Sequence, residues 1–247
     1  MFESVSAVNE NKKLGNQSLE TLMTQKERLT ADKFALVDLE LSVEEHAALA
    51  EMQIKEVGGL DSYGVDSQLV SKLKTFLEQV GENSPEASNK VASLINRLCD
   101  QVKVAFGQEA VWLTVRVSVP TNKYDLPRWH QDGRYFTATE PVYKFVAPLI
   151  GPQTLLGKCD DLEKFRALSK QLIDDDGEYD LEIQKALINE VTEMTIAQPS
   201  QGTVFLVDDE EAVIHSEPKM NVPRLFISIL PGTTDQIEEW KKQCEEE

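Results

Sequence analysis

The strongest constraint on the fold is a change in hydrophobic periodicity near Val111. In the segment VWLTVRVSV, apolar residues alternate with other residues, and this two-residue repeat is typical of a β-strand with one buried face. Before it, apolar residues recur at helical spacing, first over 69–80 and then over 91–102. The sequence therefore predicts a mainly helical region over residues 1–108 and a β region that begins at 109.

The helical region also carries start and stop signals. Ser42 with Glu45 three residues later resembles a capping box at the start of a short helix. Ser84 is placed as an N-cap before Pro85, and Gly107 follows the last apolar position as a stop. These signals predict a short helix followed by a longer one.

The β region contains further strand-like runs, interrupted by one helical excursion. The runs lie at 141–150, 202–207, 212–216 and 224–230. Helical spacing returns over 160–195. The runs between 111 and 150 are too closely spaced for crossover helices, which favours antiparallel pairing. We expect an α+β protein whose antiparallel sandwich or barrel spans 109–236, with a helical insertion at 160–195 and an acidic tail at 237–247.

Composition disfavours several classes of partner. The formal net charge is −18 and the sequence pI is about 4.6, which disfavours nucleic acid and anionic membranes. No apolar run reaches membrane-spanning length and the N-terminus has no apolar signal core, so we expect a cytoplasmic protein. The cysteines, three in number and far apart, indicate neither a disulfide framework nor a zinc ribbon.

Two of the three histidines lie beside strand-like segments. His130 and Asp132 stand two apart in RWHQDG, so they project to the same side, and His215 ends the run EAVIH 85 residues after His130. Two imidazoles and one carboxylate can bind one face of an octahedral Fe(II) and leave three positions open. The alternative is a pair of structural histidines. His46, inside a predicted helix, is assigned a surface or capping role.

These motifs resemble the Fe(II)/2-oxoglutarate-dependent dioxygenase superfamily over about residues 110–232. WHQDG is similar to its first metal motif, QGTVFLVDDEEAVIHSEP to its strand with the distal histidine, and VPRLFISI to its arginine-bearing strand. The resemblance implies a double-stranded β-helix of the jelly-roll, cupin-like type. It implies Fe(II) held by His130, Asp132 and His215, with 2-oxoglutarate as co-substrate and O2. The expected reaction is hydroxylation of a substrate with release of succinate and CO2.

The resemblance offers two candidates for the residue that binds the far carboxylate of 2-oxoglutarate. Arg224 follows His215 by nine residues, and its planar guanidinium matches a carboxylate, with Ser228 on the same strand face. Phe226 stands where many members have a hydroxyl. Lys144, twelve residues after Asp132, resembles the lysine that the Jumonji and asparaginyl-hydroxylase branch uses. We favour Arg224, and Arg116 on an earlier strand is a further candidate for the cavity.

The substrate is less constrained than the metal site. Gln131, Tyr124 and Tyr135 are candidate substrate contacts, and the helices before and within the β region are candidate walls of the open end. The substrate is predicted to be a small molecule or a protein. A noncatalytic jelly-roll binding protein is the alternative from another class. A cupin-like metalloenzyme without 2-oxoglutarate is disfavoured, because it usually has a third histidine near the first motif.

Overall fold

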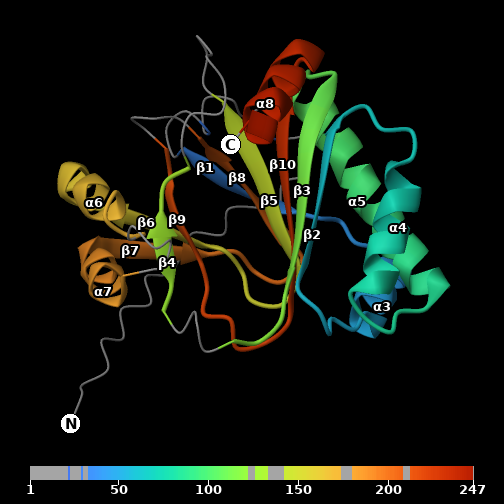
Figure 1. Ribbon diagram of the computed structural model, residues 1–247, viewed down its shortest axis with the longest axis horizontal. Coiled ribbons are helices and arrows are strands. Elements are labelled where there is room, and N and C mark those ends of the chain that lie inside the picture. Colours follow the sequence, from blue (N-terminus) through green and yellow to red (C-terminus); the bar gives the residue numbers. More distant parts are fainter. Residues whose placement is uncertain are drawn as a thin grey trace.

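A computed structural model describes residues 33–121, 126–132, 142–173, 180–207 and 212–246, together with Leu22 and Leu29. Figure 1 shows how the elements are arranged. The helices described are α3 (Val43–Glu51), α4 (Leu69–Gln79), α5 (Pro85–Phe106), α6 (Leu162–Ser169), α7 (Leu181–Glu190) and α8 (Thr234–Glu246). The strands described are β1 (Phe34–Asp38), β2 (Gly58–Gly64), β3 (Ala110–Ser118), β4 (Arg128–His130), β5 (Tyr143–Ile150), β6 (Leu155–Cys159), β7 (Val191–Ile196), β8 (Gln201–Leu206), β9 (Ile214–Glu217) and β10 (Arg224–Gly232).

The strands form two antiparallel sheets. The large sheet has the order β1-β8-β5-β10-β3-β2, and the small sheet has the order β4-β9-β6-β7. Every recorded strand pair is antiparallel. The prediction of antiparallel β structure combined with helices is therefore confirmed.

The element boundaries differ from the sequence prediction in three places. Strands β1 and β2 lie in the region expected to be mainly helical. β1 has only five residues, and β2 (GGLDSYG) contains three glycines and becomes a strand by pairing with β3, so neither gives a strong local signal. The expected tail at 237–247 belongs mostly to helix α8, and β7 begins inside the expected helical insertion.

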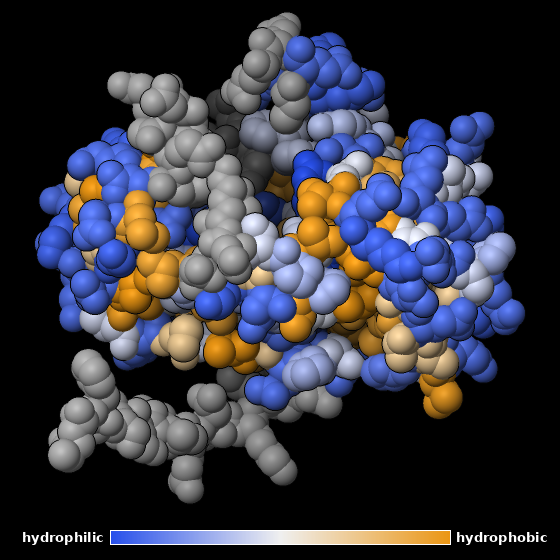
Figure 2. Space-filling model, turned by 60° about the horizontal axis from the view of Figure 1, so that its bottom comes forward, coloured by the Kyte–Doolittle hydropathy of each residue, from blue (hydrophilic) through white to orange (hydrophobic). Residues whose placement is uncertain are grey.

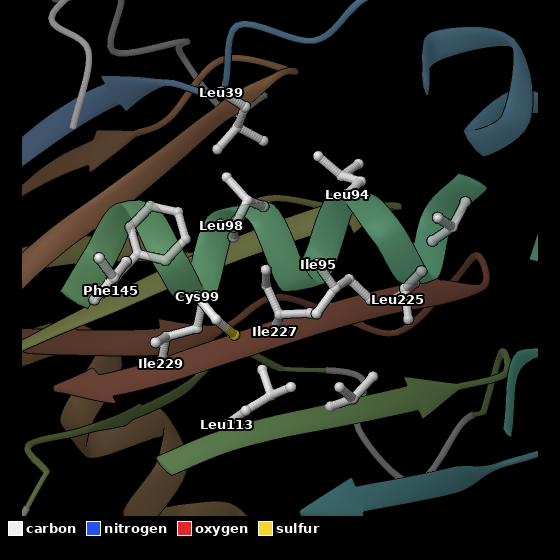
Figure 3. Packing of buried hydrophobic residues seen from close by; sticks show 14 of the residues in the cluster. Leu39, Leu94, Ile95, Leu98, Cys99, Leu113, Phe145, Leu225, Ile227 and Ile229 are labelled. Atoms are coloured by element: carbon white, nitrogen blue, oxygen red, sulfur yellow. The ribbon is translucent and has the colours of Figure 1, made fainter. Parts of the chain in front are cut away.

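The outer face of the large sheet packs against the N-terminal helices. Helix α5 follows the N-cap residue Ser84, and Gly107 with a left-handed φ of 60° is its C-cap. Both predicted helix caps are therefore confirmed. Its apolar face meets alternate residues of β10, among them Ile227 and Ile229, and Figure 3 shows Leu98 of the helix over this layer. These helices therefore cover the back of the sheet and do not wall its inner face.

The inner face of the large sheet looks toward the small sheet. Leu230 of β10 and Phe205 of β8 pack in one cluster with Leu156, which comes from β6 of the small sheet. Alternation along β10 places Arg224 and Ser228 on the same side as Leu230. The space between the two sheets is thus lined by the apolar cluster that includes Leu230 at one end of β10, and by Arg224 and Ser228 toward the other end.

Helices α6 and α7 pack behind the small sheet. Trp129 and Ile214 of that sheet form a buried cluster with Phe165 of α6 and Leu187 of α7. Figure 1 shows both helices on the side of the small sheet that faces away from the large one. The helical insertion was expected to wall the open end of the β structure. Its helices α6 and α7 instead pack behind the small sheet.

Helix α8 and an apolar hollow lie at opposite ends of the large sheet. Trp240 of α8 packs against Trp112 of β3, with ring centroids 5.3 Å apart. At the other end a hollow of about 460 Å³ is lined mainly by apolar residues, including Ile54, Ile150 and Val222. Figure 2 shows hydrophobic residues gathered on this underside. Among the described helices, none has the length and apolar character needed to cross a membrane.

Candidate metal centre

The three predicted ligands come together on the inner face of the small sheet. His130 of β4 and His215 of β9 are directly paired across the two strands, with ring centroids 4.2 Å apart. Asp132 lies two residues after His130, and its Oδ1 is 3.9 Å from His130 Nε2 and 3.6 Å from His215 Nε2. One ligand atom from each residue lies within 4.8 Å of the other two. This is a set of donor atoms around one point.

Backbone hydrogen bonds orient both imidazoles. His130 Nδ1 lies 2.9 Å from the carbonyl oxygen of Arg128, and His215 Nδ1 lies 3.0 Å from that of Val213. Since a carbonyl only accepts, each Nδ1 carries the proton in these bonds, which leaves the Nε2 lone pair free to bind a metal. Both lone pairs then point toward Asp132.

The electrostatics favour the ligand forms of these side chains. Burial lowers the pKa of His215 to about 4, and His130 adds to this effect, so the imidazole is neutral near pH 7. Burial alone would raise the pKa of Asp132, but His215, Lys144 and His130 together hold it well below its usual value. A neutral imidazole and an ionised carboxylate are the forms that bind metals.

Lys144 lies beside this cluster on the inner face of β5. Its Nζ is 3.0 Å from Asp132 Oδ2, and both side chains are largely buried, at 15% and 11% exposure. Asp132 therefore presents one oxygen to the lysine and the other to the two histidines. The lysine thus contacts one of the three predicted ligands directly.

Arg224 is a buried cation at the start of β10. Its Nε donates to the carbonyl of Pro152 and its Nη2 donates to Thr154 Oγ1, both at 3.1 Å. Within the described part of the chain no carboxylate lies at ion-pair distance from it, and burial lowers its pKa to about 10. The guanidinium carbon Cζ of Arg224 lies 4.5 Å from the centroid of the Phe226 ring. The guanidinium is therefore desolvated, and Glu217 favours its charge from beyond ion-pair distance.

The register of the small sheet places Arg224 near the metal cluster. Thr154, which Arg224 contacts, precedes Leu156 by two residues, and Leu156 is paired with His215. Two residues of strand correspond to roughly 6.6 Å. Ser228, also buried, follows on the same face of β10. Arg224 and the histidines therefore face one interior space.

Other predicted site residues lie elsewhere. Arg116 forms an ion pair of 2.9 Å with Asp61 at the β2–β3 edge, and its side chain is 45% exposed. Gln131 was expected to contact the substrate. Its side chain instead forms hydrogen bonds with Ala212 and Arg166, on the side of the strand opposite His130 and Asp132. His46 is exposed on α3. Tyr124 and Tyr135 lie outside the described residues.

Several neighbours of the cluster were not named from the sequence. Phe205 packs on His215, with ring centroids 4.7 Å apart. Arg128 and Glu217 are paired across β4 and β9, and Glu217 Oε2 is 3.8 Å from His130 Nδ1. Arg128 lies two residues before His130 and Glu217 two residues after His215, so strand pairing of the two motifs could have identified them. Thr154 has no comparable sequence signal.

The comparisons with known proteins identify the fold of this chain. No family model and no curated protein matches this sequence. The solved structures that the chain matches include non-haem Fe(II)/2-oxoglutarate-dependent enzymes. One is the Kdo hydroxylase KdoO, solved with α-ketoglutarate and Fe(III), which has 13% identity and a TM-score of 0.50. The match covers 92% of this chain and 90% of that one.

Two further matches have lower scores. The rice dioxygenase for auxin oxidation has 10% identity and a TM-score of 0.45, over 88% of this chain and 78% of that one. A Pseudomonas putida prolyl-4-hydroxylase has 14% identity and a TM-score of 0.41, over 87% and 98%. The likeness to KdoO shows that this chain has the fold of Fe(II)/2-oxoglutarate-dependent dioxygenases, so the predicted resemblance is confirmed for the fold.

Proposed function

We propose that this protein is an Fe(II)- and 2-oxoglutarate-dependent oxygenase. The observation that carries the proposal is the convergence of His130, Asp132 and His215 within 4.8 Å on the inner face of the small sheet. Two imidazoles and one carboxylate with open positions are typical of non-haem Fe(II) oxygenases. Cis donors about 2.1 Å from a six-coordinate ion lie about 3 Å apart, so small side-chain movements would complete the site.

The strand order supports a jelly-roll description of the scaffold. Along the chain, β3, β5, β8 and β10 belong to the large sheet, whereas β4, β6, β7 and β9 belong to the small sheet. Eight antiparallel strands divided between two facing sheets in this way form a jelly roll. We infer a double-stranded β-helix, to which β1 and β2 are added at the two edges of the large sheet.

Arg224 is the residue we assign to the far carboxylate of 2-oxoglutarate. A buried guanidinium with no carboxylate at ion-pair distance among the described residues is costly, and an incoming dicarboxylate would provide a paired charge. Nη1 has no acceptor among the described residues, while Nε and Nη2 are held by Pro152 and Thr154. The guanidinium is therefore fixed in orientation before the co-substrate binds. Ser228 on the same strand face is the proposed assisting hydroxyl.

Lys144 has a different role in this proposal. Its ammonium is 3.0 Å from Asp132 Oδ2, so it stands at the metal site itself and not at the distance of the far end of a bound co-substrate. Such a contact to the outer oxygen orients the carboxylate so that Oδ1 faces the metal. Lys144 is thus assigned as a positioning residue for Asp132.

The chemistry is divided between cofactor and protein. Bound Fe(II) would supply the oxidising chemistry that couples O2 and 2-oxoglutarate to oxidation of a substrate. His130, Asp132 and His215 would hold the metal, and Phe205 would exclude water beside His215. The His130 side chain is 29% exposed and that of His215 only 9%, so the substrate, a small molecule or a protein, would approach from the His130 side.

The test combines binding with turnover. Purified protein is titrated with Fe(II) and then 2-oxoglutarate under anaerobic conditions, and binding is followed by the metal-to-ligand charge-transfer absorbance. Oxygen is then added in the presence of candidate substrates, and succinate is measured. The proposal expects one Fe(II) per chain and substrate-stimulated succinate. Absence of stoichiometric metal binding would instead favour a noncatalytic jelly-roll binding protein.

A further inference from the structure

The residue between two of the proposed metal ligands makes two side-chain hydrogen bonds within the described part of the chain. In the segment His130-Gln131-Asp132, strand alternation turns Gln131 away from the cluster. Gln131 Nε2 donates to the carbonyl of Ala212, and Gln131 Oε1 accepts from Arg166 Nε at 3.0 Å. Ala212 lies three residues before His215, so this one amide connects both metal-bearing segments.

Only a side chain with both a donor and an acceptor can make this connection. A backbone carbonyl accepts and a guanidinium donates, so the amide of Gln131 matches both partners in a single orientation. A glutamate there would keep the bond to Arg166 but would place a carboxylate oxygen against the Ala212 carbonyl. An apolar residue would lose both bonds and leave the carbonyl and the guanidinium without this partner.

Arg166 anchors the amide to the helical layer behind the small sheet. It follows Phe165, which is fully buried in the cluster with Trp129 and Ile214. Trp129 and Ile214 are the immediate chain neighbours of His130 and His215. Gly157 lets the Trp129 ring pack close to β6, because a Cβ at that position would lie 2.8 Å from the ring. Helix α6 therefore contacts the back of both metal-bearing strands.

We propose that Gln131 and Arg166 are positioning residues that fix the spacing of the His130–Asp132 segment relative to His215. This inference rests on the proposed metal site and extends it to the helical insertion. Contacts behind the ligands restrict their movement before the metal arrives, so less ordering is required on binding. Loss of such outer contacts typically weakens metal binding about 10-fold to 100-fold.

The experiment uses the full chain and Co(II) alone as the probe. Gln131→Met and Arg166→Met remove the bridge, while Arg166→Lys keeps a cationic donor. Glu190→Gln is the matched control, because Glu190 pairs with Lys164 across α6 and α7 at 2.6 Å without touching Gln131. Co(II) affinity and the visible Co(II) spectrum are measured for each variant, together with the Tm of the metal-free protein.

The expected result is an affinity loss of about 10-fold or more in both Met variants, with a changed Co(II) spectrum. The metal-free protein of each variant should still unfold in one cooperative transition above the assay temperature, so that the affinity measured is that of folded protein, and Arg166→Lys should retain more affinity than Arg166→Met. Wild-type affinity and spectrum in Gln131→Met would overturn the inference, as would losses no greater than those of Glu190→Gln. Failure of the wild-type protein to bind Co(II) at one site would instead contradict the proposed function.

Discussion

The two sheets are supported by their helices in different ways. The large sheet is backed by α5, a helix of 22 residues with ten buried positions, and the contact is almost entirely apolar. The small sheet is backed by α6 and α7, of 8 and 10 residues, through a smaller apolar cluster and the amide of Gln131. The three proposed metal ligands all belong to the small sheet and its adjoining loop, which have the smaller apolar support. Stability and metal geometry should therefore respond to different substitutions.

The largest expected effect is the loss of metal binding when one of the three proposed metal-binding side chains is replaced by alanine. His130→Ala, Asp132→Ala and His215→Ala should each abolish tight Fe(II) binding, with a loss greater than the roughly 10-fold to 100-fold of an outer contact. The core behind the large sheet is untouched, so far-UV circular dichroism should stay unchanged. Equilibrium metal binding checks the first statement. Unchanged stoichiometry in all three variants would contradict the triad.

The second prediction separates the two cations that face the interior from the large sheet. Arg224→Met should weaken 2-oxoglutarate binding about 30-fold or more, because a buried carboxylate without its cation costs roughly 2 to 5 kcal/mol. Lys144→Met should affect 2-oxoglutarate less and Fe(II) more, because Lys144 contacts Asp132. Calorimetry in the presence of Fe(II) measures both constants. The reverse order would assign the co-substrate to the lysine.

Part of this site could be predicted from the sequence because its signals are local. His130 and Asp132 are two residues apart on one strand edge, so alternation alone puts them on one side. The same rule applied to Gln131 puts it on the other side, although a substrate contact had been assigned to it. The helix caps at Ser42 and Ser84 were confirmed for the same reason, since each depends on residues a few positions away.

What could not be predicted depends on contacts between distant segments. The Gly58–Gly64 strand has little intrinsic preference for β structure, and it forms because β3 offers an open edge. Its Asp61 then engages Arg116, which the sequence alone had offered as a co-substrate residue. The ion-pair partner of a charged side chain is set by strand register. Asp61 and Arg116 are 55 residues apart in the sequence, so no local sequence pattern predicts that their strands pair in this register.

The third prediction tests the support of the large sheet. Leu98 is fully buried between α5 and the sheet, so Leu98→Ala should lower the free energy of unfolding by about 2 to 5 kcal/mol through lost contacts and a cavity. Co(II) affinity of the folded protein should stay within about threefold of wild type, since no contact of the small sheet changes. Urea unfolding and metal titration check the two parts. A parallel loss of both properties would show that the two layers are not separable.

The smallest expected effect concerns the polar contact behind the large sheet, where Arg97 of α5 pairs with Glu45 of α3 at 3.0 Å. Burial opposes ionisation of Glu45, but the Ser42 backbone and Arg97 outweigh it, so the pKa of Glu45 is lower in the folded protein than in the unfolded chain. A lowered folded pKa contributes stability that is present above the unfolded pKa, about 4.3, and is lost as the pH falls through the folded value. Glu45→Gln should therefore cost about 1 kcal/mol at pH 7 and progressively less below about pH 4.

The exposed neighbour variant Glu44→Gln is the control, because Glu44 makes no contact with Arg97 in the described structure. Urea unfolding of both variants across this pH range measures the difference. Because Glu45 and Arg97 join two helices and, among the described contacts, touch neither β4 nor β9, Co(II) affinity should stay at the wild-type value, in contrast to the Arg166 variants behind the small sheet.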